Sequence, residues 1–270
     1  MFEYASAKSL AIKKKCRFCY LSQKDFYFYK KQFKKFILFK LFNKKDLFKK
    51  QLSSRDLSEY FYLDQNPLIN FFNKIFWSLK SKNKKQRYTY FFNDINFSKE
   101  KNLREFYNCN EWTYLKGCFS SEIYFTDRKK ILKWFTPKKF YAKQIINVTK
   151  KFNLPPQKRC CVHIRRGDAL YMDKGFALGN YGWSLPIEYY HHVIKKLDKN
   201  LLYIFSSDDP EWVIDKFNYL PNKIFLEKKS EVVDMFIFTK CKFNILSSGT
   251  FSWWGAWLNQ IPDKVVYAPK

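Results

Sequence analysis

A chain of 270 residues, 46% of them hydrophobic, is long enough to bury a substantial core and too apolar to be disordered throughout. Its formal net charge of +27 favours polyanionic partners, but 43 of the 51 basic residues are lysines spread along the chain. Because sequence-specific nucleic-acid readers depend on arginine, we do not expect nucleic acid as a partner.

The positions of the cysteines and glycines argue against a zinc site and against an early phosphate-binding loop. The seven cysteines are irregularly spaced, and Cys16-x-x-Cys19 has no second Cys or His pair at zinc-site distance, so we expect buried thiols in a reducing compartment. All seven glycines lie at Gly117 or later, which excludes a glycine-rich phosphate loop from the first 116 residues. We expect no signal peptide or transmembrane segment. The expected location is the cytoplasm or the cytoplasmic face of a membrane.

The N-terminal half predicts mainly helices. Strong helix formers predict a first helix over residues 5–15, and two more are expected over 127–134 and 138–152. Residues 24–50 interleave lysine with aromatic and aliphatic residues. That pattern is typical either of a face that docks on anionic membrane or of lysines that simply face water.

A linker divides the chain. The paired prolines Pro155 and Pro156 prevent regular structure, so we place the domain boundary between residues 153 and 154. The expected domains are therefore 1–153 and 154–270.

After this boundary, short apolar strands alternate with helices. The predicted strands are residues 159–164, 201–205, 224–226, 243–246 and 265–267, and the predicted helices are 186–197, 210–217, 230–241 and 251–258. Asp209 is the expected N-cap of the helix that begins at Pro210, and Ser230 is the expected N-cap of the next. This alternation predicts an α/β domain, with a parallel sheet covered by helices on both faces.

Three polar loops meet at the carboxyl edge of the predicted sheet, where such sheets bind ligands: residues 165–168, 207–209 and 247–250. The adjacent Arg165 and Arg166 can hold a diphosphate between two guanidinium groups, or else form a surface pair bridged to Asp168. His163 lies inside a strand, either as a packed residue or as part of the site. The chain contains no Asp-x-Asp, no Gly-x-Gly-x-x-Gly and no phosphate-loop motif. Cationic side chains are therefore expected to neutralise any leaving group.

Residues 163–168, His-Ile-Arg-Arg-Gly-Asp, resemble the His-x-Arg-Arg-Gly-Asp signature of the alpha-1,2-fucosyltransferases, glycosyltransferase family 11. Further segments resemble this family in the same order along the chain: residues 117–125, 185–190, 204–212, 234–241 and 248–259. The last of these contains Phe-Ser-Trp-Trp-Gly-Ala-Trp and is highly specific. Together the similar segments span about residues 112–269.

The resemblance implies a GT-B-like fold, in which two Rossmann-type lobes carry parallel sheets. The N-terminal lobe would bind the acceptor, and the C-terminal lobe would bind GDP-fucose. It also implies an inverting galactoside 2-alpha-L-fucosyltransferase that needs no metal or other cofactor. Such an enzyme moves L-fucose from GDP-beta-L-fucose to the 2-hydroxyl of a galactoside, in the synthesis of glycan or lipopolysaccharide-type carbohydrate.

The same resemblance implies roles for individual residues. Arg165 would neutralise the departing β-phosphate, Arg166 and Asp168 would shape the loop and the donor pocket, and His163 would support them. Asp168 is the expected partner of the acceptor hydroxyl, with Glu122 as its competitor. The other implied donor contacts are Asp208, Asp209 and Asp234 for guanosine, and Ser248, Thr250, Phe251 and Ser252 for the diphosphate and fucose.

The chain departs from the family pattern at both ends. Family members begin with a strand and a Gly-Gly-x-Gly-Asn-Gln loop before the helix that here starts at Met1, and they continue beyond the position of Lys270. The N-terminal lobe is therefore expected to be incomplete and largely helical. Within the motifs, Gly249 stands where Ser is common, and Ala169 where Tyr is common. The alternative function is a truncated, inactive remnant that binds a GDP-sugar.

Overall fold

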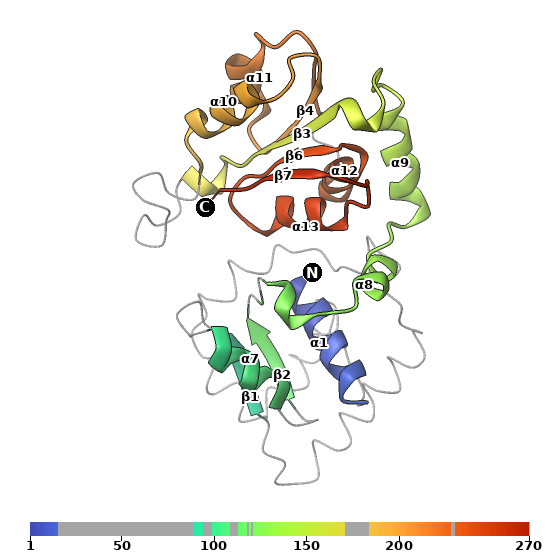
Figure 1. Ribbon diagram of the computed structural model, residues 1–270, viewed down its shortest axis with the longest axis vertical. Helices are drawn as coiled ribbons and strands as arrows, with labels where there is room; N and C mark the ends of the chain where they lie inside the picture. The colour runs from blue at the N-terminus through green and yellow to red at the C-terminus, as the bar shows by residue number, and fades with distance from the viewer. Residues whose placement is uncertain are drawn as a thin grey trace, which may run out of the picture. The chain divides into compact units, whose positions relative to one another are not determined.

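The computed structural model describes residues 1–15, 89–93, 99–108, 113–117, 119, 121–170, 184–227 and 230–269. The chain divides into two compact units, Met1–Thr136 and Pro137–Lys270 (Figure 1). The boundary predicted between residues 153 and 154 therefore falls inside the second unit. The reason is a tertiary contact, since helix α9 (Lys139–Thr149) packs on α12 (Glu231–Ile237) of that unit. Cys16, Cys19 and the lysine-aromatic stretch 24–50 lie outside the described residues.

Unit 1 is held together by aromatic contacts. Helix α1 (Phe2–Lys13) covers most of the helix predicted over 5–15, and its Tyr4 ring meets that of Trp134, with centroids 6.1 Å apart. Phe106 meets Phe119 and Tyr124 at 5.7 and 5.1 Å. The other described elements are the parallel strands β1 (Thr89–Asn93) and β2 (Thr113–Gly117), α7 (Lys99–Asn108), the 3-10 helix η2 (Glu122–Tyr124) and α8 (Arg128–Trp134).

Unit 2 is built on a five-stranded parallel sheet, which confirms the predicted α/β architecture. The strand order is β5-β4-β3-β6-β7, and every neighbouring pair is parallel. The strands are β3 (Arg159–Ile164), β4 (Leu202–Ser207), β5 (Lys223–Phe225), β6 (Phe243–Ile245) and β7 (Val265–Tyr267). All five overlap the strands predicted from the sequence.

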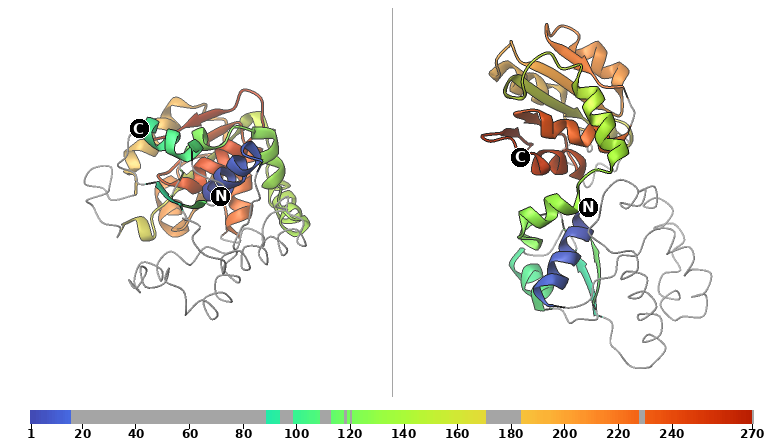
Figure 2. Two further views of the ribbon diagram at one scale, coloured as in Figure 1. Left: turned by 90° about the horizontal axis from the view of Figure 1, so that it is seen from below. Right: turned by 90° about the vertical axis from the view of Figure 1, so that its right-hand side faces the viewer.

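Helices cover both faces of this sheet, as Figures 1 and 2 show. On one face, Cys160 and Val162 of β3 pack with α10 (Ile187–Lys196) and α11 (Pro210–Phe217). On the other face, Cys161 packs with α12, the 3-10 helix η7 (Phe238–Lys240) and α13 (Thr250–Leu258). Alternate residues of β3 thus serve two cores, because successive strand side chains point to opposite faces.

Both predicted N-caps stand at the start of their helices, but only one of them makes a capping hydrogen bond. Asp209 caps α11 by accepting a hydrogen bond from the backbone N–H of Trp212, as predicted. Ser230 occupies the N-cap position of α12, but its side chain makes no capping hydrogen bond. The helix expected over 230–241 also changes to the 3-10 form after Ile237. Within the described residues, no helix combines the length and apolarity needed to cross a membrane.

Candidate active site at the carboxyl edge of the sheet

Arg165 directly follows β3 and reaches the start of α13. A Cβ atom added at Gly249 would lie 2.8 Å from Nη1 of Arg165, so the guanidinium rests directly on the glycine backbone. Gly249 is the N-cap of α13 and has a φ of 105°, which side-chain-bearing L residues rarely adopt. The first-turn N–H groups of a helix attract anions, so a guanidinium and a helix N-terminus meet here. This pairing can bind a phosphate or diphosphate.

The side chain of Arg166 lies against the first turn of α11, where it contacts Asp209 and Trp212. Its Nε donates to Oδ2 of Asp209 at 3.0 Å, and its guanidinium carbon lies 3.8 Å above the ring centre of Trp212. The two guanidinium groups thus have different neighbours, Gly249 for Arg165 and Asp209 for Arg166, and their joint grip on a diphosphate stays a prediction. Arg166 forms an ion pair with Asp209, and the alternative bridge to Asp168 stays a prediction, because the side chain of Asp168 is not among those that the structure describes.

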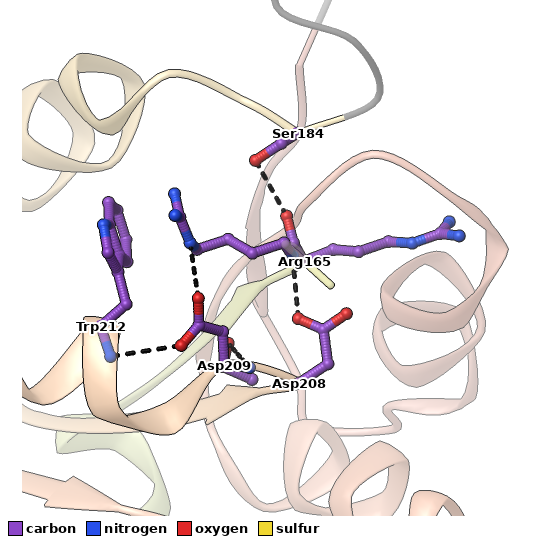
Figure 3. A network of polar contacts seen from close by, with 7 residues as sticks. Arg165, Ser184, Asp208, Asp209 and Trp212 are labelled. Atoms are coloured by element: carbon purple, nitrogen blue, oxygen red, sulfur yellow. Dashed lines mark hydrogen bonds and ion pairs between the residues drawn. The ribbon is translucent and has the colours of Figure 1, made fainter. Parts of the chain in front are cut away.

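Asp208 holds the backbone of the arginine loop. Its Oδ1 accepts a hydrogen bond from the N–H of Arg166 at 2.8 Å. Its Oδ2 lies 2.7 Å from where a Cβ at Gly167 would be, so any larger residue at 167 would displace the carboxylate. The hydroxyl of Ser184 adds a third tie by donating to the carbonyl of Arg165 at 3.2 Å (Figure 3). Asp208 and Asp209, predicted as guanosine contacts, thus bind the loop that carries Arg165.

His163 is a buried, neutral residue beneath the start of α13. Its Nδ1 lies 2.5 Å from Oγ of Ser247, and the Ser247 hydroxyl donates to the carbonyl of Ser248 at 3.1 Å. Because that hydroxyl has only one proton, Nδ1 of His163 must carry the hydrogen of the contact between them. The ring also packs on Phe251, with centroids 4.8 Å apart. Burial, followed by the positive charge of Arg165, lowers the pKa of His163 from 6.5 to about 3.

This low pKa predicts that His163 makes the fold less stable in mild acid. Between pH 6.5 and about 3 the unfolded chain binds a proton at this residue and the folded chain does not, so stability is lost as the pH falls through this range. The slope is up to about 1.4 kcal/mol per pH unit. Urea unfolding of the wild type and of His163→Gln should be measured at neutral pH and near pH 5. The free energy of unfolding should fall less between these two pH values in the variant than in the wild type. The exposed His192→Gln is the control, and equal losses in all three proteins would contradict the burial of a neutral imidazole.

The remaining predicted site residues lie at the carboxyl edge of the sheet, in the protein interior, or at positions whose side chains the structure does not describe. Thr250 is exposed at the first position of α13, whereas Ser252 is fully buried and donates to the carbonyl of Ser247, so Ser252 braces the turn and does not face a ligand. The side chain of Asp168 is not among those described. Glu122 is exposed on η2 of unit 1. The choice between Asp168 and Glu122 as the partner of the acceptor hydroxyl stays a prediction.

Asp234 lies in a cleft beside β4 and β5. Its Oδ2 accepts a hydrogen bond from Oγ of Ser206 at 3.2 Å. The cleft is lined by the end of α9, the end of β5 and the first turns of α12, including Lys151, Leu226 and Val233. The Asp234 carboxylate, which lies beside the apolar Leu226 and Val233 and the charged Lys151 and Glu227, can accept hydrogen bonds from the N–H groups of a ligand. No group of three or more His, Cys, Asp or Glu side chains in the described parts of the chain is arranged to hold a metal ion.

Sequence reasoning missed four residues that hold the site: Ser184, Ser206, Trp212 and Ser247. Trp212 carried a detectable signal, because it follows the capping Asp209 by three residues and so lies on the first turn of the same helix. Ser247 lies in the polar loop 247–250 that the sequence places at this edge, but its contact with His163 could not be predicted. The hydroxyls of Ser184 and Ser206 carried no signal, since their partners Arg165 and Asp234 are distant in sequence.

The whole chain matches one family profile, that of "Glycosyl transferase family 11", over residues 1–270. The chain belongs to this family. The resemblance to family 11 drawn from the motifs is therefore confirmed. Its Arg165 loop and the start of α13 come from two of the segments on which that resemblance rests.

Two Escherichia coli proteins are similar to this family 11 chain in sequence. The O-antigen biosynthesis glycosyltransferase WbnK is 35% identical over 132 residues, which cover 46% of this chain and 42% of WbnK. An alpha-1,2-colitosyltransferase is 32% identical over 162 residues, which cover 57% of this chain and 53% of that protein. The chain thus spans about half the length of these curated relatives.

Solved fucosyltransferase structures are also similar. The Se-Met fucosyltransferase NodZ from Bradyrhizobium aligns with a TM-score of 0.44 and 13% identity, over 75% of this chain and 77% of NodZ. NodZ alpha-1,6-fucosyltransferase soaked with GDP-fucose aligns with a TM-score of 0.40 and 13% identity, over 63% of this chain and 65% of that one.

Proposed function

We propose that this chain transfers L-fucose from GDP-beta-L-fucose to the 2-hydroxyl of a galactoside, with inversion at the anomeric carbon. The observation that carries the proposal is the guanidinium of Arg165 resting on Gly249 at the N-terminus of α13. Membership of family 11 supports it, as does the similarity to a relative named for an alpha-1,2 linkage. The expected product belongs to glycan or O-antigen-type carbohydrate.

In this proposal Arg165 and α13 stabilise the leaving group. As the bond between fucose and phosphate breaks, positive charge develops on the sugar and negative charge on the β-phosphate. A fixed guanidinium and aligned backbone N–H groups stabilise the separated charges more than the intact donor, which lowers the barrier. They supply the neutralisation that a divalent cation gives in other transferases, so we propose that no metal is needed. Arg166 acts indirectly, by tying the loop to Asp209 and Trp212.

The cleft beside Asp234 is the proposed place for the guanine ring. Guanine presents neighbouring N–H donors along one edge, and a carboxylate accepts from both. Ser206 holds the Asp234 carboxylate by a hydrogen bond, and Leu226 and Val233 provide apolar walls for the ring faces. Uracil offers only one ring N–H, so the cleft should favour GDP over UDP.

The proposal is tested by binding and by transfer. Isothermal titration calorimetry should give GDP at least about tenfold tighter binding than UDP, because UDP leaves one carboxylate hydrogen bond unmade. Incubation with GDP-fucose and lactose should yield a fucosylated product, with the 1→2 linkage identified by NMR. A chain that binds neither nucleotide would overturn the proposal. A chain that binds GDP without transferring fucose would favour the alternative, a GDP-sugar-binding protein without turnover.

A further inference from the structure

The segment that enters unit 2 carries charge of only one sign. Residues 128–167 contain thirteen lysines and arginines and no aspartate or glutamate. The chain as a whole has 24 acidic residues in 270, so a stretch of this length without any departs from the composition of the rest. Such a segment attracts an anionic surface.

Helix α9 displays this charge on one face. Its inner face packs on α12, with Ile145 buried and Val148 against the core shared with that helix. In Figures 1 and 2, α9 runs along the outer side of its unit. Every exposed side chain of α9 and of its C-cap lies on the opposite, outer face: Lys139, Phe140, Lys143, Ile146, Asn147 and Lys150. At 100° per residue these six positions fall within about a third of a turn.

Two large apolar side chains stand among these lysines. Phe140 is 64% exposed and Ile146 is 54% exposed. Apart from Phe140, only Tyr219 is more exposed than Ile146 among the large hydrophobic residues that the structure describes. Leaving an aromatic ring and a branched aliphatic chain in water is unfavourable, and it occurs here on the face that carries the lysines.

We propose that the outer face of α9 docks on an anionic lipid bilayer. The lysines complement the charge of the headgroups, while Phe140 and Ile146 enter the boundary between headgroups and acyl chains. A nucleic acid would satisfy the lysines but offers Ile146 no apolar phase. The inference is independent of the proposed donor and acceptor, since none of these residues belongs to the site.

Co-sedimentation with vesicles tests this inference. The full chain should bind vesicles of phosphatidylcholine with about a third phosphatidylglycerol, and should bind pure phosphatidylcholine far more weakly, because each lysine near an anionic surface contributes. The charge variant Lys139→Gln, Lys143→Gln, Lys150→Gln should bind the anionic vesicles about tenfold or more weakly. The apolar variant Phe140→Ser, Ile146→Ser should also bind more weakly, and its loss should persist at high salt.

Matched control variants show whether vesicle binding depends on the outer face of α9 or only on the net charge and exposed apolar groups of the whole chain. The exposed Lys195, Lys196 and Lys199 changed to Gln remove the same charge elsewhere, and Ile214→Ser with Tyr219→Ser remove exposed apolar groups elsewhere. Both controls should bind vesicles nearly as the wild type does, and all variants should keep the wild-type circular dichroism. The inference fails if the charge control loses as much binding as the α9 charge variant, or if the apolar variant binds normally. It also fails if duplex DNA binds through the α9 lysines while vesicles do not.

Discussion

Arg165→Ala is expected to lower kcat for fucose transfer about a hundredfold or more, equivalent to about 3 kcal/mol of lost transition-state stabilisation. The Arg165 guanidinium rests on Gly249 beside the first turn of α13, where the leaving phosphate would gain negative charge. Because that charge grows as the bond breaks, the loss should fall mainly on kcat and less on KM. Steady-state kinetics with GDP-fucose and lactose measure both.

Two further variants make this result specific. Arg165→Lys keeps the charge but loses the planar fork, so its kcat should lie between those of the wild type and Arg165→Ala. Arg104→Ala removes an exposed arginine from α7 of unit 1 and should leave kcat unchanged. If Arg165→Ala retains a kcat near that of the wild type, the assignment of the leaving-group site is wrong.

Gly249→Ala is expected to disturb the contact between Gly249 and the Arg165 guanidinium by changing the glycine, with a loss of both stability and turnover. At a φ of 105° an alanine is strained, which should lower the free energy of unfolding by about 1–3 kcal/mol. The added Cβ would lie 2.8 Å from Nη1 of Arg165, so the guanidinium must move away from the helix N-terminus. A displacement of about 1 Å at a catalytic group can reduce turnover up to about a hundredfold. We therefore expect kcat to fall between about tenfold and a hundredfold.

Loss of stability and loss of geometry can be separated for Gly249→Ala. Val193→Ala removes buried methyl groups from α10 and should also lower stability by about 1–2 kcal/mol, without touching Arg165. Assayed well below both unfolding transitions, Val193→Ala should keep its kcat while Gly249→Ala does not. Normal turnover in Gly249→Ala would mean that the position of the Arg165 guanidinium does not govern catalysis.

Local sequence patterns were sufficient to predict most elements of unit 2. Strands β3 and β7 have the predicted bounds, and α11 begins at Pro210 after its cap Asp209. These features depend on neighbouring residues: apolar runs, a proline and a capping carboxylate. The boundary between the two units could not be predicted from local sequence. Pro155 and Pro156 mark only a short 3-10 turn before β3, and α9 belongs to unit 2 because it packs on α12.

The amino-acid order by itself determined the parallel α/β architecture, the edge at which the polar loops gather and the family to which those loops belong. Tertiary structure alone decided which arginine meets the helix and which is held by Asp209 and Trp212, and it made Asp208 a support of the loop. The physical reason is the range of the interactions. Alternation and capping act over a few residues, whereas the direction of a side chain at a strand end depends on partners some forty to eighty positions away.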